Sequence, residues 1–320
     1  MAKFNNGYDN ITVKLIGWSG DNFAKEVYEF GRLSHDYNEV LPEVYDKNNP
    51  DCIKLINKII EGTTLPKFAM QGTRIRFQIN KISRICLAQL TRDPAIFASA
   101  STGVFPLTQE FNMPMSIIEQ KDVMDKVCQA QKLLEEAYIM LCEREIPSIE
   151  ARYVGLHPQV ISLTAAYLPY DFSRASYSRT SSNFCDECNY LYRLMYHEIF
   201  KAIDELEDAN SIRLWKWLIN EGNCINDGFY KRERLFNSDF TCGKYSPKLP
   251  ALNDWRKSGW KKELERMYNE KPYLLTYNEY LMIEEWLSLE LHGYELPTTY
   301  DGTKSDVLKN AIKEMDYYEK

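Results

Sequence analysis

The alternation of apolar and polar residues predicts a half-buried strand at 73–79 that leads directly into a helix. In TRIRFQI, one side of the strand carries the apolar residues Ile75, Phe77 and Ile79. The other side carries the arginines and the glutamine of this segment. A period of two is typical of a strand with one buried face. From Ile82 onward the apolar spacing becomes helical. Pro94 is expected to end this helix, because the residue before a proline is disfavoured in the helical conformation.

The same periodicities predict most of the other elements. A short strand is expected at 11–17, and helices are expected at 21–36, at 51–60, at about 117–145 and at 191–206. Residues 95–105, AIFASASTGVF, are small and hydroxyl-rich and are expected to form a loop. Residues 146–158, IPSIEARYVGLHP, predict a turn, a short helical start and an extended exit.

The character of the chain changes beyond about residue 215. Segments rich in Trp, Tyr and Lys are separated there by Gly and Pro, and helices are expected near 253–269, 277–290 and 304–318. We therefore predict two parts, a mixed helix and strand domain at 1–215 and a helical extension at 216–320.

Composition excludes several classes of protein. The net charge of -7 with scattered basic residues argues against a duplex nucleic-acid surface. No apolar run is long enough for a signal peptide or a membrane span, so a soluble cytoplasmic protein with no membrane association is expected. Eight cysteines in 320 residues are too few for a disulfide scaffold, and free thiols are expected.

Known motifs give little support to metal or nucleotide-fold chemistry. Cys185 and Cys188 form one close pair, but Cys224 and Cys242 do not supply the second pair of a zinc site, so no metal is expected. The chain has no GxSxG, GxGxxG, GxxxxGK[ST] or HExxH pattern. Hydrolase, Rossmann and P-loop functions therefore lose their sequence support.

Arginines remain as candidates for binding an anion. They are Arg84, Arg92, Arg152, Arg174 and Arg179. The planar guanidinium suits a phosphate, a carboxylate or the carbonyl edge of a pyrimidine. The alternative is that these are surface arginines whose aliphatic stems cover apolar neighbours.

The order of these segments resembles the flavin-dependent thymidylate synthases. The strand FQI leads into SRICLAQLTR, and a hydroxyl-rich stretch, a long helix and the segment EARYV follow. The residues that match the family's motifs are Ser83, Arg84, Gln89, Arg92, the run from Glu150 to Val154 and, further on, Arg179. The resemblance spans roughly residues 10 to 210.

The chain departs from the family pattern at positions that take part in the family's chemistry. Where the family motif reads Arg-His-Arg, this chain reads Arg92-Asp93-Pro94, and Thr63 stands in place of a flavin-contacting histidine. Either catalysis is lost and the fold is kept, or the pocket is rebuilt around a different nucleotide, folate or step. In the second case Ser99, Ser101, Thr102 and Gly103 are expected to cradle a phosphate through hydroxyl and backbone N–H groups.

The resemblance implies an α+β core with an antiparallel sheet and long helices, assembled as a homotetramer with FAD at a subunit interface. It also implies transfer of a one-carbon unit from methylenetetrahydrofolate to C5 of a pyrimidine deoxynucleotide monophosphate, with NADPH as a candidate reductant. Activation of C5 places negative charge on the ring oxygen, and an arginine at that edge stabilises this charge.

The resemblance also implies roles for individual residues. Arg179 is expected to contact the base as the catalytic arginine. The nucleotide is expected to be held by Gln89, Ser99, Ser101, Thr102, Arg152 and Arg174, and the flavin by Thr63, Arg84, Arg92 and Asp93. Ile85, Leu87 and Leu90 are expected to pack into the core beneath them.

Several alternatives stay open. The product is either a methyl or a hydroxymethyl pyrimidine, and the base is either uracil or cytosine, for which Asp93 and Asp171 are candidate acceptors of the amino group. The other functions are a catalytically silent subunit that binds nucleotide or a partner, and an unrelated helical scaffold with scattered arginines.

Overall fold

The computed structural model describes residues 3–33, 45–61, 69–99, 110–155, 158–179, 186–218, 260–271 and 274. Its strands are β1 (Lys3–Asn6), β2 (Thr12–Trp18), β3 (Ile75–Ser83), β4 (Ala95–Ser99), β5 (Glu110–Met113) and β6 (Val160–Tyr167). Its α-helices are α1 (Phe23–Leu33), α2 (Pro50–Ile60), α4 (Arg84–Leu90), α5 (Met115–Ile118), α6 (Lys121–Glu143), α7 (Ser148–Ala151), α8 (Pro169–Arg179), α9 (Asp186–Ile203), α10 (Ala209–Lys216) and α12 (Trp260–Glu270). Short 3-10 helices, η1 (Gly20–Asn22) and η2 (Arg152–Val154), precede α1 and follow α7.

The centre of the molecule is a four-stranded antiparallel sheet in the order β2-β3-β6-β4. Phe77 of β3 lies opposite Leu15 on one side and Ala165 on the other, and Ala165 in turn lies opposite Phe97 of β4. A separate two-stranded sheet pairs β1 with β5 in parallel. The predicted combination of helices with an antiparallel sheet is confirmed.

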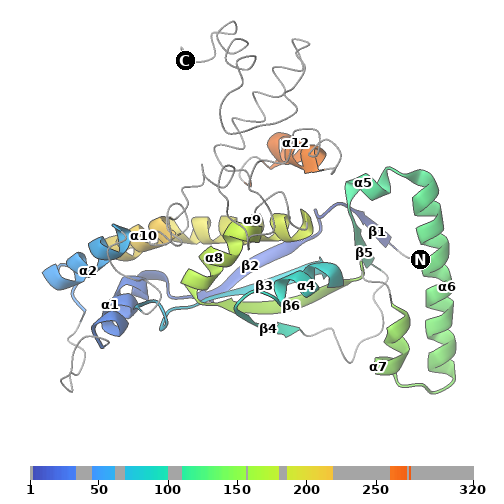
Figure 1. The fold of residues 1–320 in the computed structure, drawn as a ribbon, viewed down its shortest axis with the longest axis horizontal. Helices are drawn as coiled ribbons and strands as arrows, with labels where there is room; N and C mark the ends of the chain where they lie inside the picture. The colour runs from blue at the N-terminus through green and yellow to red at the C-terminus, as the bar shows by residue number, and fades with distance from the viewer. Residues whose placement is uncertain are drawn as a thin grey trace, which may run out of the picture.

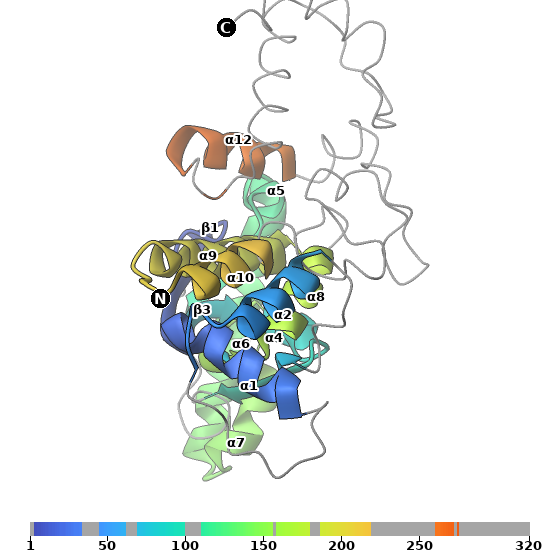
Figure 2. The same cartoon turned by 90° about the vertical axis from the view of Figure 1, so that its left-hand side faces the viewer.

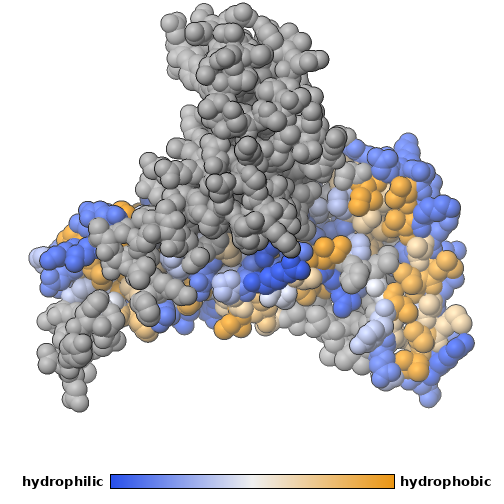
Figure 3. Space-filling model, in the orientation of Figure 1, coloured by the Kyte–Doolittle hydropathy of each residue, from blue (hydrophilic) through white to orange (hydrophobic). Residues whose placement is uncertain are grey.

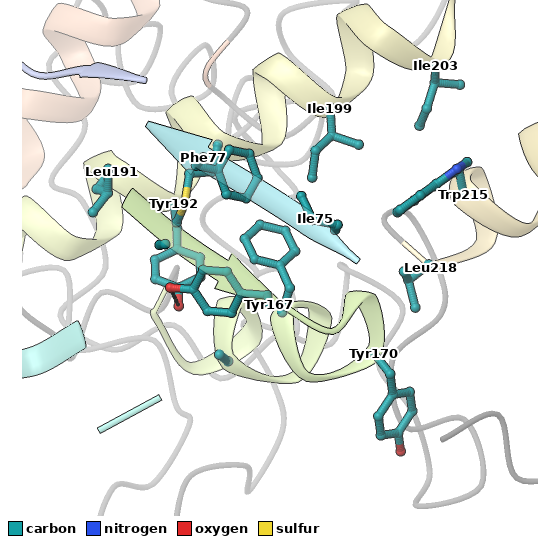
Figure 4. Close-up of a cluster of buried hydrophobic side chains, with 14 of the residues drawn as sticks. Ile75, Phe77, Tyr167, Tyr170, Leu191, Tyr192, Ile199, Ile203, Trp215 and Leu218 are labelled. Carbon is teal, nitrogen blue, oxygen red and sulfur yellow. Dashed lines mark hydrogen bonds between the residues drawn. The ribbon is translucent and has the colours of Figure 1, made fainter. Parts of the chain in front are cut away.

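Helices cover one face of this sheet (Figure 1). On β3, Ile75, Phe77 and Ile79 are buried and the intervening Arg76 and Gln78 are exposed, as the alternation predicted. Helix α9 runs over the buried face through its own apolar residues, among them Leu191, Met195, Ile199 and Ile203. Figure 4 shows this core, with Phe77 and Tyr167 from the sheet beside Tyr192 from α9.

Several elements between residues 84 and 179 differ from the prediction. The expected loop at 95–105 begins with strand β4, and β6 and α8 lie between residues 160 and 179, where no element was expected. Strand β4 is stabilised by pairing with β6 along its whole length, which no local pattern of small residues reveals. Helix α4 also ends earlier than expected, at Leu90, and Pro94 precedes β4 instead.

Helix α6 confirms the long helix expected at about 117–145. Together with α5 and α7 it stands to one side of the sheet in Figure 1, and α12 lies beyond α9 in both Figure 1 and Figure 2. Figure 3 shows apolar side chains at the surface over α6, where Leu133, Ile139 and Met140 are all exposed. No helix among the described residues is long and apolar enough to cross a membrane.

The boundary expected at 215/216 lies at the end of α10. Large apolar side chains are buried both before and after this boundary. Trp215 stacks on Phe23 and donates from Nε1 to the carbonyl of Gly20 at 3.1 Å. Trp217 and Leu218 are buried as well. Helix α12 confirms the first helix expected in the extension, and the expected helices near 277–290 and 304–318 lie outside the described residues.

Candidate functional site

Ser83 fixes the point where strand β3 becomes helix α4. Its side chain caps the helix by accepting from the N–H of Cys86 at 3.0 Å. Its backbone N–H and its hydroxyl both donate to the buried carboxylate of Glu187 on α9. The start of α4 is therefore set by a contact with a helix far away in the sequence.

Helix α4 turns one face to the core and another to the surface. Cys86 and Leu90, four residues apart, are fully buried. The expectation that Ile85 packs into the core was wrong, since its side chain is 44% exposed. Helical spacing places Ile85 on the same side as half-buried Gln89, and exposed Arg92 follows the end of the helix. Gln89 therefore lies on an accessible side of α4.

The end of α4 meets the end of α8 through a buried ion pair. Arg179 donates from Nε and from Nη2 to Oδ1 of Asp93, at 2.9 and 2.5 Å. Nη2 also donates to the backbone carbonyl of Gln89 at 2.9 Å. Arg179 is 6% exposed and Asp93 is 9% exposed. Sequence reasoning selected both residues, and the structure brings them into direct contact.

Two tyrosines continue this network into the core. Tyr192 donates to Oδ2 of Asp93 at 2.7 Å, and the hydroxyls of Tyr192 and Tyr167 are 3.2 Å apart. The ring of Tyr192 stacks on that of Phe172. Burial, together with the neighbouring Tyr167 and Asp93, raises the pKa of Tyr192 well above its ordinary value, so its hydroxyl keeps its proton.

The ion pair also determines the charge state of the arginine. Burial by itself lowers the pKa of Arg179, but the hydrogen bond and the negative charge of Asp93 outweigh it and raise the pKa. Arg179 is therefore a fixed cation whose charge is partly balanced by Asp93.

Two further cations flank α4. Arg84 is half-buried at the start of the helix, and Arg92 is exposed just after its end. Within the ranges that the structure describes, neither arginine takes part in an ion pair. Guanidinium groups in this state suit a phosphate or diphosphate, so the donors present fit the anionic part of a nucleotide or of FAD.

The remaining predicted site residues are placed less completely. Arg152 begins η2, Arg174 lies within α8 and Ser99 ends β4, and nothing is described of these three side chains. Thr63, Ser101, Thr102 and Gly103 lie outside the described residues. Asp93 acts as the acceptor for Arg179 and Tyr192, and its contact with a cofactor stays a prediction.

Sequence reasoning missed Glu187 and Tyr192, although a signal for both was present. Each is a polar residue on the otherwise apolar face of a helix, which indicates a buried partner. Cys188, considered with Cys185 as a metal ligand, lies instead beside Cys86, with 3.3 Å between their Sγ atoms, and both are free thiols. Cys185, Cys224 and Cys242 lie outside the described residues.

Comparisons with known proteins give a likeness in fold. No protein-family model and no curated protein matches the sequence. The crystal structure of the UMP/dUMP methylase PolB from Streptomyces cacaoi bound with 5-Br dUMP matches with a TM-score of 0.50 and 16% identity, over 67% of this chain and 96% of that chain. A second structure of PolB, bound with 5-Br UMP, has a TM-score of 0.49 and 13% identity, over 68% of this chain and 97% of that chain. The chain thus has a fold similar to that of PolB.

Proposed function

We propose that this protein transfers a one-carbon unit to C5 of a pyrimidine nucleoside monophosphate. The observation that carries the proposal is the convergence of the ends of α4 and α8, where Gln89, Asp93 and Arg179 meet in a fold similar to that of a UMP/dUMP methylase. In the described structure they form one connected cluster at the end of a helix flanked by unpaired arginines.

Each part of the cluster has a role in this proposal. Arg179 meets the carbonyl edge of the base and stabilises the negative charge that develops when C5 is activated. Gln89 holds the nucleotide beside it. Arg84 and Arg92 supply positive charge for phosphate groups, and half-buried Arg84 and exposed Arg92 are both accessible to a ligand.

FAD is the proposed cofactor, with methylenetetrahydrofolate as the one-carbon donor and NADPH as a candidate reductant. Arg84 and Arg92 would hold the diphosphate of FAD, and FAD when bound would supply the redox chemistry that the side chains of the chain lack. The residues of the chain bind and orient the nucleotide and stabilise charge on its ring.

The base and the product are the finer points of the proposal. Guanidinium groups donate only, so Arg179 favours a carbonyl at C4 of uracil over the amino group of cytosine. Both oxygens of Asp93 already accept hydrogen bonds from protein donors, which weighs against Asp93 as the acceptor for that amino group. We therefore propose uracil as the base, with a methyl or a hydroxymethyl product. A homo-oligomer, as the resemblance implies, is part of the proposal.

A second candidate is a protein of this fold that binds the nucleotide without catalysis. The observation that favours it is the ion pair itself, because Asp93 balances part of the charge that Arg179 would offer to an oxyanion. Asp93 also stands where the resembled family has a histidine. This candidate predicts nucleotide binding without bound flavin.

The visible absorbance spectrum of freshly purified protein separates the two candidates. Oxidised FAD at about one per chain, released on denaturation and identified by mass, supports the enzyme. Incubation with dUMP or dCMP, methylenetetrahydrofolate and NADPH would then give a methylated or a hydroxymethylated product by mass spectrometry. Nucleotide binding with no flavin, bound or taken up, supports the silent protein, and absence of binding to either ligand contradicts both.

A further inference from the structure

We infer that Asp93, backed by Tyr192, is a positioning residue that fixes the direction in which Arg179 meets the nucleotide. This inference rests on the proposed function, because it takes Arg179 as the residue that contacts the base. It adds the residues that orient this arginine, which lie on α9 and at the junction of α4 with β4.

Three hydrogen bonds hold one edge of the Arg179 guanidinium. Asp93 Oδ1 accepts from Nε and Nη2 of Arg179, and the carbonyl of Gln89 accepts from Nη2 as well. The guanidinium is planar, so holding the Nε and Nη2 edge fixes the plane and thereby the direction of Nη1. Because the side chain of Arg179 is already held, binding a ligand costs little further side-chain entropy.

The backbone of Asp93 is held on both sides of the residue. Its backbone N–H donates to the carbonyl of Leu90 at 2.9 Å, and its own carbonyl accepts from the N–H of Ala95 at 2.8 Å. Pro94 follows and restricts the backbone further. The carboxylate is thus carried on a chain segment that α4 and β4 hold at both ends.

Buried Tyr192 is a second donor to the carboxylate of Asp93. Tyr192 occupies Oδ2 of Asp93, so that Oδ1 is the oxygen turned to Arg179. Tyr192 is fully buried, its ring is stacked on Phe172 and its hydroxyl lies 3.2 Å from that of Tyr167. Rotation of the carboxylate would break the hydrogen bond to Tyr192, which makes this tyrosine the group that holds Asp93 in place.

The test compares Asp93→Asn and Tyr192→Phe with the wild type in the full-length protein. Binding of dUMP and of 2′-deoxyribose 5-phosphate, which has no base, is measured by titration calorimetry. The expected result is a loss of dUMP affinity of about tenfold or more for D93N and a smaller loss for Y192F, with unchanged affinity for the sugar phosphate. The change should therefore be confined to the ligand that carries a base.

Asp9→Asn is the matched control. Asp9 also accepts from an arginine and a lysine, Arg266 and Lys271, but it lies in the turn between β1 and β2, and these partners belong to α12 and the residue that follows it. D9N is expected to bind dUMP within twofold of the wild type. The Nε–H resonance of Arg179, followed by NMR, should lose its protection from exchange in D93N and keep it in D9N.

Each outcome decides the inference. A lower melting temperature with wild-type dUMP affinity in both D93N and Y192F would show a structural role alone and overturn it, as would equal losses for dUMP and the sugar phosphate. If D93N does not fold, Y192F, which keeps the buried ring, decides. Wild-type protein that binds none of UMP, dUMP and dCMP would overturn the proposed function together with the inference, and this failure is distinguishable because it occurs without any substitution.

Discussion

Ser83 and Glu187 join the start of helix α4 to helix α9 through two hydrogen bonds to one carboxylate. The backbone N–H of Ser83 donates to Oε1 of Glu187 at 2.6 Å, and its hydroxyl donates to Oε2. Asn112 of β5 donates to Oε1 at 2.8 Å and also to the carbonyl of Lys81 at 2.7 Å. A single buried carboxylate thus connects the junction of β3 and α4, the small sheet and α9.

Glu187→Gln should remove a pH-dependent part of stability. Burial raises the pKa of Glu187 above its ordinary value of 4.5, although its hydrogen bonds to Ser83 and Asn112 oppose the shift. The folded chain therefore binds this proton more tightly than the unfolded chain. The stability from this group is fully present below pH 4.5 and is lost as the pH rises through the folded pKa.

The measurement for Glu187 is urea unfolding of the wild type and E187Q between pH 4 and 8. The difference in unfolding free energy between them should move in favour of E187Q as the pH rises. Glu187→Ala is the comparison, since it leaves the N–H of Ser83 and the amide of Asn112 without this acceptor and should cost about 1–3 kcal/mol for each buried group left unsatisfied. Parallel pH curves for the wild type and E187Q would contradict the prediction.

Arg179→Met should destabilise the protein more than the loss of side-chain contacts explains. It leaves Asp93 as a buried charge without its cationic partner, and breaking a buried pair in this way costs about 3–5 kcal/mol. The double variant with Asp93→Asn should recover part of this cost. A double-mutant cycle in chemical denaturation tests the coupling, and additive free energies would show that the two side chains do not interact in solution.

Arg84→Ala and Arg92→Ala should each weaken binding of anionic ligands. Loss of one charge-assisted hydrogen bond corresponds to about 1.5–3 kcal/mol, or roughly a tenfold to hundredfold change in the dissociation constant. The dissociation constants of dUMP and FAD at low and high salt are the measurement. Lys54→Ala, on the surface of α2, is the control of equal charge change. Losses as large in K54A would indicate a general effect of net charge.

Truncation on either side of Leu218 should give different results. A chain that ends at Trp215 lacks buried Trp217 and Leu218, and it also lacks the carbonyl of Leu218 that accepts from the hydroxyl of Ser173 at 2.8 Å. A chain that ends at residue 219 keeps these contacts. Thermal unfolding should show the shorter chain to be less stable by several degrees, and equal melting temperatures would place the end of the core before Trp217.

Asp9→Asn should loosen the contact of helix α12 with the rest of the chain. Asp9 accepts from Arg266 and Lys271, and Lys271 also donates to the hydroxyl of Tyr190 at 2.9 Å. The cluster is partly exposed, so the expected loss of global stability is below about 1 kcal/mol. Hydrogen exchange at residues 260–271 should nevertheless rise, and more so at low than at high salt because salt already weakens the pairs. Unchanged exchange would show that α12 is held by other contacts, such as the buried Met267.

Local patterns were sufficient to predict the elements whose two faces differ. Strand β3 and helices α2 and α6 were predicted because their apolar residues recur with a period of two or of a helical turn. Strand β4 was not, because its two large apolar residues, Ile96 and Phe97, are adjacent and so lie on opposite faces, and its stability comes from its pairing with β6. Strand β6 was missed too, since much of its length is buried between β3 and β4.

By itself the sequence determined which residue types are available for chemistry, and in the end segment of α4 it singled out Gln89, Arg92 and Asp93. Only the tertiary structure decided that Asp93 accepts hydrogen bonds from Arg179 of α8 and that Ser83 donates to Glu187 of α9. The periodicity of a segment records which face will be buried, but it carries no information about the partner that buries it. A buried charge must find its counter-charge wherever folding brings one within hydrogen-bonding distance, and that choice is made by the packing of α4, α8 and α9 on the sheet.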